Sequence, residues 1–148
     1  MGRFNKYYFA VAIFLSTNAF AGNTGVIEVD VTGLKHDKGK LNIRLHDNAT
    51  SFPGKPAKSV KGVSVKIENR QAHARFEDVT YGEYAIAVYH DENNNGELDT
   101  NFIGIPSEAV GASNNAKGRF GPPKFKDARF VVNKPLTNQS ISMNYETQ

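Results

Sequence analysis

Apolar and polar residues alternate along much of the chain after residue 22, which is the pattern that half-buried β-strands require. In the first such run Ile27, Val29 and Val31 share one face, and Glu28 and Asp30 lie on the other. Apolar residues alternate or cluster in six further runs, at residues 41–45, 63–67, 72–76, 84–88, 130–132 and 141–145. No stretch shows the 3.6-residue period of an amphipathic helix.

Seven short strands in a chain of 148 residues predict an all-β fold. We expect a single antiparallel β-sandwich of the immunoglobulin-like or transthyretin-like kind, with one long ordered loop. Residues 68–71 read Glu-Asn-Arg-Gln, which is a candidate tight turn. The strands on either side of this turn are therefore expected to form a hairpin.

Residues 91–126 interrupt the strand pattern, because they show no periodicity and are rich in glycine and proline. A loop of this length inside a compact domain is usually either functional or disordered. Its apolar side chains, among them Phe102, Phe120 and Phe125, favour a packed loop. This loop is accordingly the first place to look for function.

The first 21 residues have the three parts of an export signal. Arg3 and Lys6 form a basic start, residues 7–15 are apolar, and residues 19–21 read Ala-Phe-Ala, a small-x-small cleavage site. The apolar run is much shorter than the roughly 20 residues needed to cross a bilayer. We predict a signal peptide at 1–21, cleaved near Ala21, and a periplasmic or secreted β-sandwich domain at 22–148 with no transmembrane segment.

Charge and composition narrow the classes of function. Without Arg3 and Lys6, 16 of the 18 basic residues remain against 15 acidic residues, a balance that argues against nucleic-acid binding. The chain has no Cys, and it contains neither a G-x-S-x-G nor an H-E-x-x-H motif. A glycosidase-like carboxylate pair stays open, but no catalytic set stands out, so binding is favoured over catalysis.

Residues 90–101 read HDENNNGELDTN and follow the spacing of a calcium-binding loop. Positions 1, 3, 5, 7 and 9 of such a loop correspond to Asp91, Asn93, Asn95, Glu97 and Asp99. Four of these would bind through side-chain oxygens, whereas Glu97 would offer its backbone carbonyl. Gly96 at position 6 permits the sharp turn.

The motif departs from the helical calcium loop, because Phe102 stands where that loop has a bidentate glutamate. A further ligand would have to come from Glu92, Glu108 or Asp127. With only two carboxylates at the ligand positions, we expect weak Ca²⁺ affinity, about 10⁻⁴–10⁻³ M. The alternative is an Asn- and Gly-rich turn whose side chains cap their own backbone.

Two further groups are candidate ligand-binding residues, His90 before the acidic loop and Arg119 in a basic segment at 113–126. His46 and His90 each precede an aspartate, but opposite strand parity disfavours a shared metal site, with His90 inward and His46 outward. Arg119 and its neighbouring lysines could bind an anion. The alternative is that they neutralise the acidic loop.

The ordered motifs YHDENNNGELDTN at 89–101, GIPSE at 104–108, SNN at 113–115 and FGPPKF at 120–125 are distinctive in combination. Together with VTGL at 31–34, they resemble the DUF2141 family of exported bacterial proteins of unknown function. The resemblance implies a small secreted or periplasmic β domain. It implies no activity, catalytic residue or ligand.

The sequence therefore predicts an exported, non-catalytic β-sandwich that binds a protein, peptide or glycan and carries a calcium-stabilised loop. The alternative is a small-ligand carrier or enzyme with a pocket under loop 91–126, served by His90, Asp91 and Arg119. A purely structural envelope component is a third hypothesis.

Overall fold

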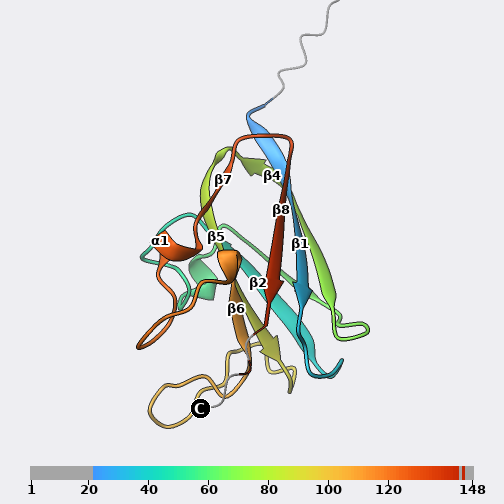
Figure 1. Ribbon diagram of the computed structural model, residues 1–148, viewed down its shortest axis with the longest axis vertical. Coiled ribbons are helices and arrows are strands. Elements are labelled where there is room, and N and C mark those ends of the chain that lie inside the picture. The colour runs from blue at the N-terminus through green and yellow to red at the C-terminus, as the bar shows by residue number, and fades with distance from the viewer. Residues whose placement is uncertain (1–21, 144, 146–148) are drawn as a thin grey trace, which may run out of the picture.

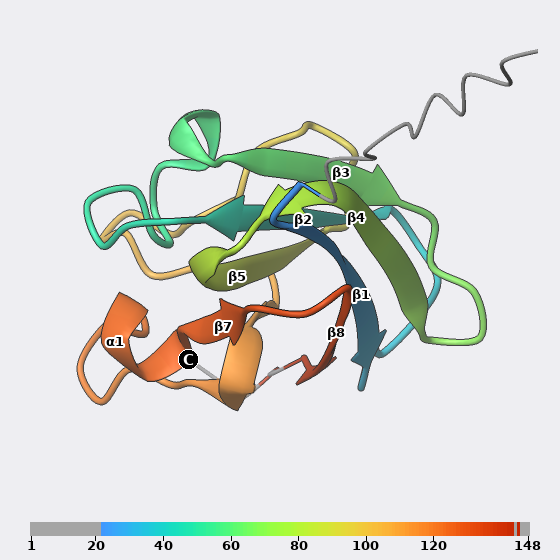
Figure 2. The same cartoon turned by 90° about the horizontal axis from the view of Figure 1, so that it is seen from above.

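The computed structural model describes residues 22–143 and Tyr145, so the predicted signal peptide lies outside the described residues. Two sheets face each other (Figures 1 and 2). The smaller sheet has the order β4-β1-β8, with bounds Ala72–Thr80, Thr24–Thr32 and Leu136–Ser142. The larger has the order β3-β2-β5-β6, with bounds Lys61–Val65, Lys40–His46, Gly82–Asp91 and Val110–Ala112, and β7 (Phe130–Val132) also pairs with β5.

The core lies between the two sheets and consists of the apolar side chains that alternate along each strand. Ile27, Val29 and Val31 of β1 are fully buried, as the alternation predicts. Ile43 of β2 and Ile86 of β5 face them from the larger sheet and belong to the same apolar cluster. The expected all-β sandwich is confirmed. Among the described residues, no helix is long and apolar enough to cross a membrane.

The connection between β3 and β4 differs from the predicted hairpin. The turn forms, since Glu68 and Gln71 exchange two backbone hydrogen bonds, and Asn69 and Arg70 adopt positive φ. However, β3 pairs with β2 and β4 pairs with β1, so the chain crosses from one sheet to the other. Buried Ile67 anchors the crossing in the core, which local turn composition does not reveal.

Strand β8 also departs from the antiparallel expectation, because it pairs with β1 in parallel. The chain reaches β8 from β7, which pairs with β5 of the larger sheet. A crossover of this kind, unlike a hairpin, does not force the new strand to run antiparallel to its neighbour. The direction of β8 is thus set by the path of the preceding chain.

The segment predicted as a single loop at 91–126 is divided by short elements. Strand β6 is followed by a 3₁₀ turn, η2 (Ser113–Asn115), and a four-residue helix, α1 (Phe125–Ala128), begins near its end. The buried Ser113 hydroxyl accepts a hydrogen bond from the Ile86 N–H at 2.8 Å and donates to the Ala128 carbonyl at 2.6 Å. One side chain therefore links the start of η2 and the end of α1 to β5.

We predict that Gly39→Ala destabilises the protein. Gly39 has a φ of 81°, and an added Cβ would lie 2.1 Å from the Asp91 carbonyl oxygen. The left-handed backbone alone costs about 1–2 kcal/mol for a non-glycine residue, which lowers Tm by several degrees in a domain of this size. Gly54→Ala is the matched control, because no heavy atom lies within 4 Å of its added Cβ. Equal Tm values for the two variants would contradict the prediction.

Candidate functional site

The acidic loop begins with Asp91, a buried carboxylate at the end of β5. Its Oδ1 accepts a hydrogen bond from the Asn95 N–H at 3.0 Å, and its Oδ2 accepts one from the Gly96 N–H at 2.9 Å. Gly96 has a φ of 83°, which supplies the turn that the sequence motif required. The Tyr89 hydroxyl donates to the Gly96 carbonyl at 2.9 Å. Asp91 thus closes the first turn of the loop.

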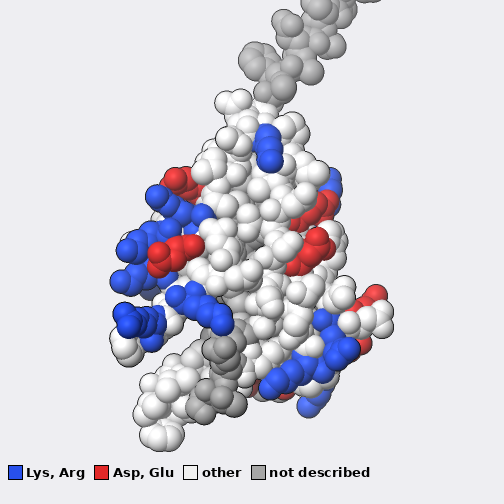
Figure 3. Space-filling model, in the orientation of Figure 1, with Lys and Arg blue, Asp and Glu red and all other residues white. Residues whose placement is uncertain are grey.

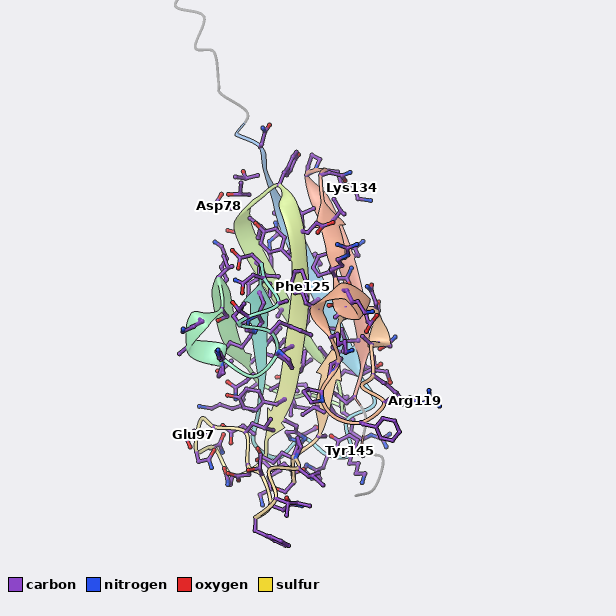
Figure 4. The ribbon with its side chains drawn as sticks, turned by 90° about the vertical axis from the view of Figure 1, so that its left-hand side faces the viewer. Asp78, Glu97, Arg119, Phe125, Lys134 and Tyr145 are labelled. Atoms are coloured by element: carbon purple, nitrogen blue, oxygen red, sulfur yellow. The ribbon has the colours of Figure 1, made fainter. Side chains whose placement is uncertain are left out.

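A second carboxylate, Asp99, gathers two asparagine side chains of the loop. Asn93 Nδ2 donates to Asp99 Oδ2 at 2.6 Å, and Asn95 Nδ2 donates to Asp99 Oδ1 at 2.8 Å. The amide oxygens of the same asparagines accept backbone N–H groups, from Asn95 and Glu97 respectively. The Glu97 side chain lies exposed at the outer edge of the loop (Figure 4).

Glu108 joins the two arms of the loop. Its carboxylate is buried, with Oε1 accepting the Glu92 N–H at 2.9 Å and Oε2 accepting the Asp99 N–H at 3.1 Å. Sequence reasoning considered Glu108 only as a further metal ligand. Glu108 connects two backbone segments, at Glu92 and at Asp99. This contact depends on how residues 92–108 fold, and the spacing of residues in the sequence does not predict it.

The donor set of this loop is chemically suited to Ca²⁺, which prefers hard oxygen ligands. Four of the predicted ligands are gathered, since Asn93 and Asn95 both bind Asp99 and Asp91 binds the Asn95 backbone. Both amides direct nitrogen, not oxygen, at Asp99, so an ion would require both to turn. Within the described residues, no group of three or more His, Asp or Glu side chains is arranged to hold a metal.

The tip of the loop displays apolar side chains. Asn101 Oδ1 accepts the N–H groups of Ile103 and Ile105 at 3.1 and 3.0 Å, which folds residues 101–105 into a small turn. Phe102 is 98% exposed and Ile103 is 64% exposed. The expectation of a packed loop is therefore wrong at Phe102, because this side chain lies almost wholly in solvent.

The other aromatic residues of the segment divide in the same way. Phe125 packs against Phe52, with ring centroids 6.0 Å apart. Phe120, by contrast, is 96% exposed. Hydrophobic content does not predict which of Phe120 and Phe125 is exposed. The difference arises because Phe125 packs against Phe52 on the outer face of the larger sheet.

His90 is fully buried, and both of its ring nitrogens are engaged. Nε2 lies 2.6 Å from the Lys38 carbonyl oxygen and therefore donates to it, which leaves Nδ1 to accept from the Tyr145 hydroxyl at 3.0 Å. That hydroxyl also accepts the Lys35 N–H at 3.1 Å. Burial raises the pKa of Tyr145, so the hydroxyl keeps the proton that this arrangement needs.

Arg119 lies on the segment before α1, whereas His90 lies in β5, and the Arg119 guanidinium is 5.9 Å from the Phe120 ring. A surface hollow of about 350 Å³ adjoins Arg119, and His90 does not line it. The structure therefore brings together four of the five predicted calcium ligands, but not the predicted set of His90, Asp91 and Arg119. Figure 4 shows Arg119 and Glu97 on separate sides of the same end of the sandwich.

His46 differs from the sequence prediction in its burial. It lies on the outer face of the larger sheet, as its parity indicates, but it is fully buried, because Phe52 covers it at a ring-centroid distance of 5.7 Å. It pairs with Ala85, at the opposite end of β5 from His90, so the two histidines form no shared site. Burial lowers the pKa of His46 below 6.5, and Asp47 partly opposes that shift.

The fold and the loop together define a small all-β sandwich domain with a polar loop braced by buried carboxylates. The chain belongs to the family described as "Uncharacterized protein conserved in bacteria (DUF2141)", whose sequence model matches residues 29–140. This confirms the resemblance found from the sequence motifs. No curated protein and no solved structure matches the chain.

We predict that His46 makes the protein less stable in mild acid. Its folded pKa is lowered, so its contribution is fully present above about pH 6.5 and is lost as pH falls through the folded pKa. His73 acts in the opposite sense, because its hydrogen bond to Asp30 raises its pKa. Comparing the wild type with His46→Leu separates the two histidines.

Between about pH 7.5 and pH 5, Tm of the wild type should fall by more than Tm of His46→Leu. Thermal unfolding followed by circular dichroism measures both slopes. Ser51, the hydrogen-bond partner of His46, keeps its contact with the Asn48 carbonyl in the variant. Identical slopes would show that His46 does not set the acid response.

Proposed function

We propose that this protein is an exported, non-catalytic binding module that presents the tip of its acidic loop to a partner protein, peptide or glycan. The observation that carries this proposal is Phe102, a large apolar side chain almost wholly in solvent at the end of a braced loop. Keeping such a side chain in water forgoes about 1.5–3 kcal/mol of burial free energy. A partner that covers the tip recovers that free energy.

The bracing of the loop supports a role in binding. Asp91 and Glu108 each hold two backbone N–H groups, so the loop approaches a partner already ordered. Preordering reduces the entropy that association must lose. The same engagement supports a non-catalytic role, because these buried carboxylates are bound to the backbone of their own loop.

Calcium binding is part of this proposal. Its support is the spacing of the loop and the gathering of Asn93 and Asn95 around Asp99. An ion coordinated by Asp91 and Asp99 would add a link between the two arms of the loop. Rotation of both amides would supply neutral oxygens, at the expense of the hydrogen bonds that hold those amides now.

We predict a saturable rise of Tm with added Ca²⁺, measured after EDTA treatment. At ten times the dissociation constant the stabilisation is about 1.4 kcal/mol, a shift of several degrees. Asp99→Asn should abolish the rise, because it removes the carboxylate around which the asparagines gather. Glu97→Gln should retain it, since Glu97 would bind only through its carbonyl. A rise equalled by Mg²⁺, or a flat response, would contradict calcium binding.

We predict that a photo-crosslinking amino acid at position 102 captures a partner in cells that express the full chain. A discrete adduct is expected at 102, because this side chain is almost wholly exposed at the tip of the loop. Leu136 is the control position, since it is an exposed apolar residue on β8, away from the acidic loop. Gel mobility and mass spectrometry identify the adduct. No adduct at 102, or equal adducts at both positions, would contradict a dedicated binding tip.

A further inference from the structure

A second candidate site lies on the segment before α1, apart from the acidic loop. There a surface hollow of about 350 Å³ is lined by four basic side chains, one acidic side chain and the exposed Phe120. The basic residues are Lys117, Arg119, Lys124 and Lys126, and the acidic residue is Asp127. The volume falls in the lower part of the range found for small-ligand sites.

Positive charge predominates among the residues that line this hollow. Leaving Lys117 aside, three cations against one carboxylate give a formal charge of +2. Among the described residues, Arg119, Lys124 and Lys126 form no ion pair with an acidic side chain. Figure 3 shows Lys and Arg gathered at the left edge of the molecule, where Figure 1 places α1 and the loop before it. An external anion would relieve this repulsion.

The backbone around the hollow is held in a defined shape. Gly118 approaches the Gly121 carbonyl so closely that an added Cβ would lie 1.7 Å from its oxygen. Beyond the hollow, the Phe125 ring packs on Phe52. Asn114 Nδ2 donates to the Arg129 carbonyl at 2.8 Å and closes the segment. The cations therefore stand on a folded-back loop whose two ends are fixed.

We propose that this hollow binds a phosphate-bearing ligand, with Arg119, Lys124 and Lys126 holding the phosphate group and Phe120 contacting the part next to it. The planar guanidinium of arginine matches the geometry of phosphate oxygens, and lysine adds compact positive charge. A ligand with a less polar part beside its phosphate would cover the Phe120 ring. Such chemistry is shared by soluble phosphate esters and by the headgroups of anionic phospholipids.

Two probes distinguish these sources. The first is sn-glycerol 3-phosphate, followed by chemical-shift changes in the purified protein. The second is co-sedimentation with vesicles of phosphatidylcholine alone or mixed with phosphatidylglycerol. Shifts at residues 117–126 with the soluble probe identify a soluble ligand. Binding to the mixed vesicles alone identifies a lipid headgroup. Binding to neither probe overturns the proposal.

Paired charge reversals test whether the site is specific. The double variant Lys124→Glu and Lys126→Glu should weaken binding by at least about tenfold, as expected when charge-assisted hydrogen bonds are lost. The double variant Lys55→Glu and Lys58→Glu is the matched control, because it makes the same change in net charge on two exposed lysines near η1 (Pro56–Lys58). Equal losses in the two would show nonspecific attraction and overturn the proposal.

Gly118→Ala tests the shape of the hollow without changing any charge. The added methyl group meets the Gly121 backbone, so the loop must open and the cations must separate. Binding should weaken several-fold while the circular dichroism spectrum stays that of the folded domain. Unchanged affinity in a folded Gly118→Ala variant would overturn the proposal that this hollow is the binding site.

Discussion

The arrangement of this domain depends on strand β5, and above all on the two polar residues at its end. β5 pairs with β2, β6 and β7, so it holds the larger sheet together. Successive residues of a strand point to opposite faces, and His90 and Asp91 therefore serve different partners. His90 fixes the β1–β2 connection and Tyr145, while Asp91 closes the acidic loop. One strand end thus orders three segments that are distant in sequence.

The burial of these polar groups explains why the acidic loop has a single shape. A buried carboxylate is costly unless its oxygens accept hydrogen bonds, and Asp91 and Glu108 meet that requirement with backbone N–H groups of the loop. The loop in turn has those N–H groups satisfied although it contains no regular strand or helix. Side chains thus supply much of the order of this loop, beside the backbone hydrogen bonds at residues 99–107, while the Phe102 side chain at its tip is 98% exposed.

The sequence predicts well what depends on local alternation and poorly what depends on contacts between distant segments. The faces of β1 and β5 follow directly from side-chain parity, and so does the sandwich. The sheet crossing after β3 and the parallel direction of β8 do not, because the buried Ile67 and the path out of β7 determine them.

At the candidate sites the same distinction holds. The spacing of residues 91–99 predicts a loop whose polar side chains lie close together. It does not predict that Glu108 binds two backbone N–H groups of this loop, because that contact depends on how residues 92–108 fold. The composition of residues 91–126 predicts a packed loop, yet Phe102 and Phe120 are exposed and Phe125 packs against Phe52. Composition does not show which aromatic rings have a packing partner. Strand parity places His46 on a polar face, and only the position of Phe52 shows that this face is covered.

The relation between the acidic and basic segments has a further consequence. The sequence leaves open the alternative that the cations at 117–126 neutralise the carboxylates of the acidic loop. In the fold, Asp91, Asp99 and Glu108 direct their oxygens at N–H groups of their own loop. None of these carboxylates forms an ion pair with Arg119, Lys124 or Lys126 among the described residues. Since Asp91, Asp99 and Glu108 are engaged within their own loop, they do not neutralise the basic segment, and Arg119, Lys124 and Lys126 keep their positive charge exposed to solvent.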